Sequence, residues 1–309
     1  MDGNKDILVR FWGVRGSYPV PGEHTIRYGG NTSCVEIRTR NQLLVLDAGT
    51  GIIQLGRQLL KEIPQYSAKK SGSLTVTILI THTHHDHIQG FPYFSPAYQT
   101  GSVLYVYGPK TFSDDLVQIL SRTMEPHYSP IRLDDLNSQK IIKNLNDNDL
   151  LVLSAKSKEP QIYHPDQIRP NPQKDVLVRV MRSYAHPKEG VFIFRIEANG
   201  KSVVYATDTE GYAGGDARLI DFSKRAHLLI HDAQYDPEEY LDPDYPKQGF
   251  GHSTYEMAAT VAKAAGAKQL VLFHHDPWHD DEKIAEMEAK AKELFPNTIA
   301  GVEGLEIKI

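Results

Sequence analysis

A short segment of the chain holds four side chains of the kind that bind transition metals. It directly follows the apolar run Leu74–Ile80, which is predicted to be a buried strand. The spacing i, i+2, i+4, i+5, placed where a strand turns into a helix, directs the side chains towards two neighbouring points. Imidazole and carboxylate ligands together suit zinc, manganese or iron. The four candidate ligands are His82, His84, Asp86 and His87.

Other candidate ligands also come directly after short apolar runs. Because reactive groups gather outside the carboxyl ends of strands in α/β sheets, we expect these side chains to join the first four at one edge of the fold. Together they would complete two metal sites of the two-metal hydrolase kind, with one carboxylate free to bridge. The candidates that complete the sites are His186, Asp208 and His274, and Asp47 after Leu43–Leu46 is a further polar residue at the same edge.

The alternative interpretation is a histidine-rich surface loop, because the chain has 14 histidines and a close pair could be accidental. Taken singly, His186 or His274 would more often be an ordinary histidine. Four ligand-type residues within six positions after a buried strand favour the metal site.

The motif order resembles that of the metallo-β-lactamase superfamily. The resemblance runs from His82-x-His84-x-Asp86-His87 through His186 and Asp208 to His274. It implies a four-layer αββα sandwich of the α/β class with the site at one edge. It also implies that one metal is held by His82, His84 and His186, the other by Asp86, His87 and His274, and that Asp208 bridges them. His275 could compete with His274, and Asp47 is expected to orient a ligand.

A second resemblance is to the ribonuclease Z branch. Leu229-Ile-His-Asp-Ala233 resembles its His-Glu-Ala-Thr motif, with Asp232 in place of Glu and Gln234 in place of Thr. Gly251-His-Ser-Thr254 matches its His-Ser-Thr motif. The resemblance implies that Asp232 and His252 form a dyad that handles the leaving-group proton. The alternative for His252 is a residue that merely precedes a helix cap.

The chain also departs from ribonuclease Z, which binds tRNA with a long arm inserted after the third-motif histidine. The interval between His186 and Asp208 is too short for such an arm. This departure favours the smaller phosphodiesterases of the branch, which act on cyclic and small diesters. The predicted function is therefore hydrolysis of a small or cyclic nucleotide-type phosphodiester by hydroxide that bridges two divalent transition-metal ions, zinc first, manganese or iron otherwise. In this account His252 and Asp232 supply the proton, and Asp86 serves the centre as a ligand.

Three alternatives stay open. One is a ribonuclease Z-like endonuclease acting at RNA 3′ ends, and another is a lactone or amide hydrolase on the same fold. The third is a metal-stabilised sensor or scaffold without activity, although every expected ligand position is filled.

Contacts to the substrate are indicated only weakly. Arg15 and Arg27 lie in glycine-rich segments near the start and could clamp a phosphate. Tyr93 follows the metal motif and could stack on a base, but core packing explains aromatic residues there equally well. Surface arginines need no role in binding.

The elements that must position these residues are short strands and a few helices. Met257–Ala265, after a predicted capping box at Ser253–Glu256, and Asp281–Leu294 are predicted helices, and Ser113–Arg122 is a weaker one. Residues 124–175 are rich in Pro, Asn and Asp, and are predicted to be an irregular insertion in a single domain of residues 1–309. The predicted strands are Ile7–Trp12, Leu43–Leu46, Leu74–Ile80, Val103–Tyr107, Val176–Val180, Val191–Ile196, Ser202–Ala206, His227–Ile230 and Leu270–Phe273.

Composition agrees with a globular enzyme. A formal charge of −5 gives no global basic field, so long nucleic acid is not an expected partner. Cys34 is the single cysteine and excludes an internal disulfide, which fits a reducing compartment. No secretory signal or membrane-length apolar run is visible, and a cytoplasmic location is expected. The oligomeric state is open, a homodimer included.

Overall fold

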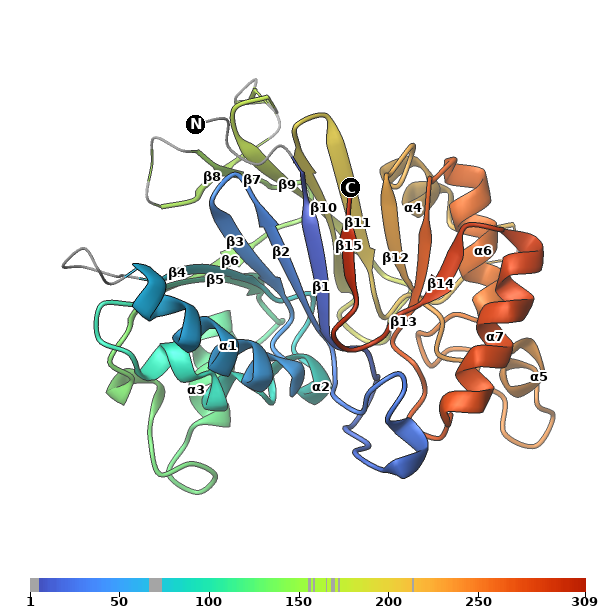
Figure 1. The fold of residues 1–309 in the computed structure, drawn as a ribbon, viewed down its shortest axis with the longest axis horizontal. Helices are drawn as coiled ribbons and strands as arrows, with labels where there is room; N and C mark the ends of the chain where they lie inside the picture. Colours follow the sequence, from blue (N-terminus) through green and yellow to red (C-terminus); the bar gives the residue numbers. More distant parts are fainter. Residues whose placement is uncertain are drawn as a thin grey trace.

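The computed structural model describes residues 6–66, 74–154, 157, 159–164, 166–167, 170–171, 173–212 and 214–309. Two β-sheets pack face to face, and helices cover the outer side of each (Figure 1). This is the four-layer αββα sandwich that the resemblance to the metallo-β-lactamase superfamily implies. In the described residues, no helix is long and apolar enough to cross a membrane.

The first sheet has seven strands in the order β15-β1-β2-β3-β4-β5-β6. Helices α1 (Gly51–Tyr66), α2 (His85–Ile88) and α3 (Leu116–Thr123) lie on its outer side (Figure 1). Its strands are β1 (Leu8–Gly13), β2 (Cys34–Thr39), β3 (Gln42–Leu46), β4 (Thr75–Leu79), β5 (Val103–Pro109), β6 (Gln139–Leu145) and β15 (Glu306–Lys308).

The second sheet has eight strands in the order β14-β13-β12-β11-β10-β9-β7-β8. Helices α4 (Ala217–Phe222), α6 (Tyr255–Ala265) and α7 (Asp281–Leu294) lie on its outer side (Figure 1), and the short helix α5 (Pro237–Tyr240) follows β12 in the chain. Its strands are β7 (Leu150–Leu153), β8 (Gln161–Tyr163), β9 (Val176–Ser183), β10 (Val191–Ala198), β11 (Lys201–Ala206), β12 (Leu228–Asp232), β13 (Leu270–Phe273) and β14 (Thr298–Ala300).

The main core fills the space between the sheets. Buried side chains from both sheets form one cluster, with Phe11, Tyr107, Phe194 and Phe273 among the largest. Burying a large apolar side chain contributes about 1.5–3 kcal/mol, so this layer is the principal source of stability. Separate clusters hold the helices to the outer face of each sheet.

Strand direction decides where the site can form. β3, β4, β5 and β6 run parallel to one another. β11, β12 and β13 are also parallel, and β9 shares their direction because both β9 and β11 are antiparallel to β10. The carboxyl ends of these strands are therefore where loops from both sheets can meet.

All nine predicted strands are confirmed within one to three residues at each end, and the helix at Asp281–Leu294 is confirmed as predicted. The predicted capping box at Ser253–Glu256 is wrong by one residue. Thr254 is the N-cap of α6, and its hydroxyl accepts a hydrogen bond from Met257 N. The hydroxyl of Ser253 instead donates to the carbonyl of Thr209 at 2.5 Å.

The described part of residues 124–175 contains three strands, between stretches of turns and loops. It forms β6, which is the edge of the first sheet, and β7 and β8, which extend the second. The segment therefore links the two sheets. Two of its prolines, Pro165 and Pro172, lie outside the described residues.

Candidate active site

The structure brings all seven predicted metal ligands together at the carboxyl ends of strands from both sheets. His82 and His84 lie in the loop after β4, and Asp86 and His87 are on α2, which begins directly after that loop. The second sheet supplies the others, one after each of three strands. These are His186 after β9, Asp208 after β11 and His274 after β13.

The first group of donor atoms combines three imidazoles with one carboxylate. His186 Nε2 lies 3.1 Å from His84 Nδ1, and Asp208 Oδ2 lies 3.5 Å from His82 Nε2 and 3.9 Å from His186 Nε2. The donor atoms of the four residues all lie within 4.8 Å of one another.

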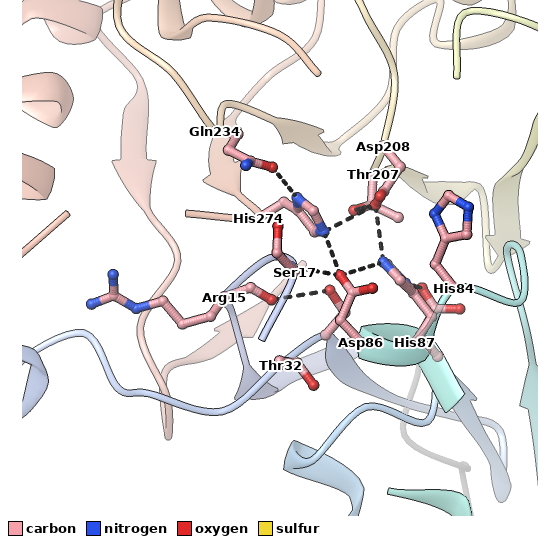
Figure 2. Close-up of polar contacts among 12 residues, drawn as sticks. Arg15, Ser17, Thr32, His84, Asp86, His87, Thr207, Asp208, Gln234 and His274 are labelled. Carbon is pink, nitrogen blue, oxygen red and sulfur yellow. Dashed lines mark hydrogen bonds and ion pairs between the residues drawn. The ribbon is translucent and has the colours of Figure 1, made fainter. Parts of the chain in front are cut away.

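The second group uses two imidazoles and two carboxylates (Figure 2). His87 Nε2 lies 3.2 Å from Asp86 Oδ2 and 3.1 Å from Asp208 Oδ1. His274 Nε2 lies 3.1 Å from Asp86 Oδ2 and 3.2 Å from Asp208 Oδ1. Asp208 thus gives one carboxylate oxygen to each group, which is the arrangement of a bridging ligand.

The spacing fits divalent metal ions. In a tetrahedral centre with bonds of about 2.0 Å the donor atoms lie about 3.3 Å apart, close to the distances above. His82 Nε2 and His87 Nε2 are also buried and form no hydrogen bond of good geometry among the described residues, although oxygens of Asp208 lie 3.5 Å and 3.1 Å from them. A buried polar atom without a hydrogen bond lowers the stability of the fold unless a ligand binds it. Both point into the two groups, where a metal ion would bind them.

The electrostatics of the site also fit a cation. Burial alone would raise the pKa of Asp86 and Asp208, but the surrounding histidines hold both well below the usual range. Burial lowers the pKa of His82 well below its usual value, so this imidazole is neutral. Burial opposes charge on His87 too, yet the carboxylates of Asp208, Asp86 and Asp47 raise its pKa. Ionised carboxylates and a neutral imidazole are the forms that bind metals.

Three contacts behind the ligands orient them. His87 Nδ1 lies 2.8 Å from Asp47 Oδ2, and His274 Nδ1 lies 3.0 Å from Gln234 Oε1 (Figure 2 draws the latter). His186 Nδ1 lies 3.1 Å from the carbonyl of Gly251. Each partner accepts the proton on Nδ1, which leaves Nε2 free to bind a metal. The sequence indicated that Asp47 orients a ligand. It did not indicate this role for Gln234, because the partner of Gln234, His274, follows a different strand.

Asp47→Asn should weaken zinc binding about 10–100-fold, because the carboxylate that orients His87 loses its charge. The hydroxyls of Thr81 and Tyr205 also donate hydrogen bonds to the Asp47 carboxylate. In the asparagine variant one oxygen is replaced by an NH₂ group, which cannot accept these hydrogen bonds. Competition for zinc with a chromophoric chelator measures the effect. Asp149→Asn is the matched control, since Asp149 is buried and caps the turn at Asn146, away from the site. Equal zinc affinity in both variants would contradict the role given to Asp47.

The strand ends that carry the ligands have unusual backbone. Asp47, Asp208 and His274 have φ of +61°, +52° and +64°, in the left-handed region. Such conformations cost of order 1–3 kcal/mol in residues other than glycine, and they persist where surrounding structure enforces them. Close packing helps to do so, because a side chain at Gly16 would overlap the ring of His274.

His274, and not His275, faces the site. His275 Nε2 lies 3.1 Å from the carbonyl of Gly301, and its ring is buried on the other side of the backbone. Burial and the nearby Arg15 guanidinium lower the pKa of His275 to about 3. The interpretation that favoured His274 therefore agrees with the geometry.

Asp232 and His252 form a close pair beside the metal ligands. Asp232 Oδ2 lies 2.7 Å from His252 Nδ1, while Asp232 Oδ1 accepts from the backbone N–H groups of Gln234 and Ser253. The ring of His252 stacks on His274 with centroids 4.9 Å apart and lies edge-on to His186 at 5.2 Å. It thus adjoins both groups. Burial opposes its charge, but Asp232 raises the pKa of His252 to about 9.

Asp232, His252 and His274 could by spacing alone hold a third ion. In the structure, hydrogen bonds between protein groups already occupy three of these donor atoms. Asp232 Oδ2 is taken by His252 Nδ1, and His274 Nδ1 by Gln234. A hydrogen-bonded pair leaves His252 Nε2 as the one free nitrogen of the dyad, which suits a proton donor.

The three predicted substrate contacts lie elsewhere. Arg15 is fully buried, and its guanidinium donates to the carbonyls of Gly29, Asp276 and His279, pointing away from the ligands (Figure 2). The prediction of a phosphate clamp at Arg15 is therefore wrong, because this cation serves to hold three loops together.

Arg27 and Tyr93 are exposed and have no described contact with the ligands. The guanidinium of Arg27 packs over the ring of Tyr28 at 5.0 Å. Tyr93 lines a surface groove with Ile53 and Tyr98, beside α1. Neither position supports the predicted substrate contact.

Comparison with known families and relatives agrees with the geometry. Residues 42–275 match the model of the beta-lactamase superfamily domain. Ribonuclease Z of Synechococcus sp. is 27% identical over 98% of this chain and 99% of its own length. Ribonuclease Z of Pyrococcus horikoshii is 26% identical over 95% of this chain and 93% of its own length.

Solved structures show the same fold. The metallo-beta-lactamase fold protein YhfI from Bacillus subtilis has a TM-score of 0.64 at 19% identity, covering 98% of this chain and 100% of its own. Human tRNase Z, short form, has a TM-score of 0.61 at 22% identity, covering 97% and 98%.

The family match, the fold and the His/Asp clusters together indicate divalent metal ions and hydrolytic chemistry. The chain belongs to the metallo-β-lactamase superfamily, as a ribonuclease Z-like member and a metal-dependent hydrolase.

Proposed function

We propose that this protein is a two-metal phosphodiesterase that cleaves RNA near 3′ ends, which is the activity that its resemblance to the ribonuclease Z branch implies; its curated relatives are named Ribonuclease Z. The observation that carries the hydrolytic part is the carboxylate of Asp208, which gives one oxygen to each of two ligand groups. The two groups are His82, His84 and His186 on one side, and Asp86, His87 and His274 on the other. Zinc suits both, with manganese or iron as alternatives.

Two divalent ions held there would supply Lewis acidity, which makes hydroxide available near neutral pH and offsets charge on phosphate oxygens. The chain itself supplies the charge and shape of the site. Asp86 and Asp208 are ionised, buried and fixed by the surrounding imidazoles, so they need little reorganisation during the reaction.

His252 is placed to give a proton to the leaving oxygen. A ribose oxygen leaves poorly as an alkoxide and therefore needs an acid. His252 Nδ1 is held by Asp232 at 2.7 Å, so Nε2 is the atom that can face the substrate. The stacking of His252 on His274 puts this donor next to the second ligand group. Amide and lactone hydrolysis do not call for such a pair.

The relatives favour RNA over the small diester predicted from the sequence. Curated proteins named Ribonuclease Z match the chain along almost its whole length, at 24–27% identity. The chain is therefore proposed to act on a larger RNA substrate, and its possible association as a homodimer stays a proposal.

A small or cyclic nucleotide diester is the second candidate, because one feature of the fold favours it. β9 and β10 are joined directly by residues 184–190, and β10 and β11 pair from Ala198 and Lys201 onward. The interval from His186 to Asp208 is thus fully used by two strands and short turns. There is no room in it for the tRNA-binding arm that the resemblance to ribonuclease Z implies.

A substrate panel with the zinc-loaded enzyme tests both candidates. The panel comprises a tRNA precursor with a 3′ trailer, cyclic mononucleotides and dinucleotides, bis(p-nitrophenyl) phosphate, nitrocefin and a simple lactone. We expect endonucleolytic cleavage of the RNA, with kcat/KM at least about tenfold above that for any cyclic nucleotide.

The pattern across the panel separates the outcomes. A higher kcat/KM on a cyclic nucleotide, with no RNA cleavage, would transfer the assignment to the second candidate. Turnover of nitrocefin or the lactone without any diester hydrolysis would contradict both.

A further inference from the structure

The loop between α5 and α6 is built around one carboxylate. Glu210, two residues after Asp208, accepts hydrogen bonds from the Tyr240 hydroxyl at 2.5 Å, from Gly249 N at 2.8 Å and from Gly251 N at 3.0 Å. Gly249 and Gly251 have φ of +84° and +89°, which other residues rarely adopt. The loop is therefore fixed by the strand end that carries the bridging ligand, and it leads directly into His252.

One cation in this loop, Lys247, forms no close ion pair among the described residues, although the Asp242 carboxylate interacts with its charge at longer range. The ammonium of Lys247 lies 5.9 Å from the ring centroid of Tyr235 and 5.8 Å from that of Phe250. In the part of the chain that the structure describes, Lys247 makes no ion pair. A lysine held between two rings without a close ion pair, in a chain of net charge −5, is available to an anionic ligand.

The Lys247 ammonium lies near the proposed proton donor, His252. The ring of Tyr235 lies edge-on to that of His252, with centroids 6.1 Å apart. Tyr235 therefore separates the ammonium of Lys247 from the proton donor by one ring. Since His252 faces the leaving oxygen, Lys247 lies on the leaving-group side of the site.

The aromatic side chain beside Lys247 is open to solvent. Phe250 is 54% exposed although it lies two residues before a buried histidine. A single exposed aromatic residue is common on protein surfaces and needs no explanation. An exposed ring that lies beside a lysine without a close ion pair, two residues before the proton donor, is a combination suited to a nucleotide, which has a flat base and a phosphate.

We propose that residues 245–251 form a subsite for single-stranded RNA on the leaving-group side. The ring of Phe250 stacks on a base, and the Lys247 ammonium contacts a backbone phosphate beyond the one that is cleaved. The proposal rests on the proposed function for the identity of the substrate, and it does not rest on the metal ions. Neither residue belongs to the ligand set or to the dyad.

A binding measurement tests the subsite without turnover. Fluorescence anisotropy with a labelled ten-residue oligouridylate gives the dissociation constant at several salt concentrations. Phe250→Ala should weaken binding about tenfold, the usual worth of stacking one base. Lys247→Ala should lower the slope of log K against log salt by about 0.7, which corresponds to one phosphate of a single strand. Phe250→Tyr should retain the affinity.

A second measurement separates this proposal from the proposed function. kcat/KM is measured on the same oligonucleotide and on bis(p-nitrophenyl) phosphate, which has no base and no second phosphate. Both alanine variants should lose about tenfold on the oligonucleotide and less than about twofold on the aryl ester. Lys268→Ala is the control, because Lys268 is exposed and lies before the amino end of β13, whereas His274 follows the carboxyl end of the same strand.

The results distinguish the two ideas. Unchanged oligonucleotide affinity in Phe250→Ala, or an unchanged salt slope in Lys247→Ala, would overturn the subsite. Equal losses on both substrates would also overturn it, because they would mean that the loop only supports the site. An enzyme that binds the oligonucleotide through these residues but hydrolyses no diester would instead contradict the proposed function alone.

Discussion

Asp208→Ala should lose at least about 10³-fold in kcat on every diester and should bind fewer metal ions per chain. Asp208 is the one residue whose two carboxylate oxygens lie in both ligand groups, at 3.1 Å from His87 Nε2 and 3.5 Å from His82 Nε2. Its removal takes one ligand from each group, and charge stabilisation by the metals is worth several kcal/mol.

The measurement is kcat on bis(p-nitrophenyl) phosphate together with zinc content by elemental analysis. Asp134→Ala, which removes an exposed carboxylate from the turn at Leu133–Asp135, is the control and should change neither quantity. Asp208→Asn keeps the volume of the side chain and reports whether the charge or the shape matters. Full activity in Asp208→Ala would refute the two-metal assignment.

His252→Ala should lose about 10² to 10⁴ in kcat on a nucleotide diester and little on bis(p-nitrophenyl) phosphate. A general acid matters in proportion to how much the departing oxygen needs a proton. p-Nitrophenolate leaves unaided at neutral pH, whereas a ribose oxygen does not. Zinc content should be unchanged, because His252 is not one of the proposed ligands.

Asp232→Asn should show the same pattern more weakly. Oδ1 accepts from two backbone N–H groups, and the asparagine carbonyl can keep those bonds while the charge beside His252 is lost. His227→Ala removes a half-buried histidine next to β12, away from the site, and controls for the loss of an imidazole. Equal losses on both substrates would mean that His252 serves binding or structure, and the proton would have to come from elsewhere.

The ligand set could be predicted from the sequence because two simple regularities combine there. Four ligand-type residues follow one buried strand, and each remaining candidate follows another strand end. In parallel strands those ends share an edge, so His186, Asp208 and His274 had only one place to meet. The capped helices were predictable for an equally local reason, since cap residues and apolar spacing lie close together in the chain.

Elements whose signal depends on tertiary contacts were missed. β2 contains Glu36, which is 1% exposed and reads as a surface residue in the sequence. In the fold, Trp12 Nε1 donates to it at 2.7 Å and Arg38 pairs with it. A partner on the neighbouring strand β1 and another on β2 itself thus allow a charge inside a strand that is covered on both faces.

Helix α1 and the strands β6 to β8 were missed for different reasons. α1 begins in Gly49-Thr-Gly51, which reads as a turn, although Ile52, Leu55 and Leu59 lie on one buried face. β6 to β8 are short or half exposed, and the prolines and asparagines around them obscure the pattern. β6 and β8 are edge strands, which pair on one side only, so their sequences are less constrained.

The role of Arg15 could not be inferred from residue type. A guanidinium in a glycine-rich segment suits a phosphate as well as it suits backbone carbonyls. Its partners come from residues 29, 276 and 279, which only the folded chain brings together. Gln234 was overlooked for the same reason, because its partner His274 follows a different strand.

The most direct test of the two-metal account is a crystal structure of the zinc-loaded protein with data collected on both sides of the zinc absorption edge. The account predicts two anomalous peaks per chain. One would be bound by His82, His84, His186 and Asp208, and the other by Asp86, His87, His274 and the second oxygen of Asp208. A single peak, or a peak between Asp232 and His252, would contradict it.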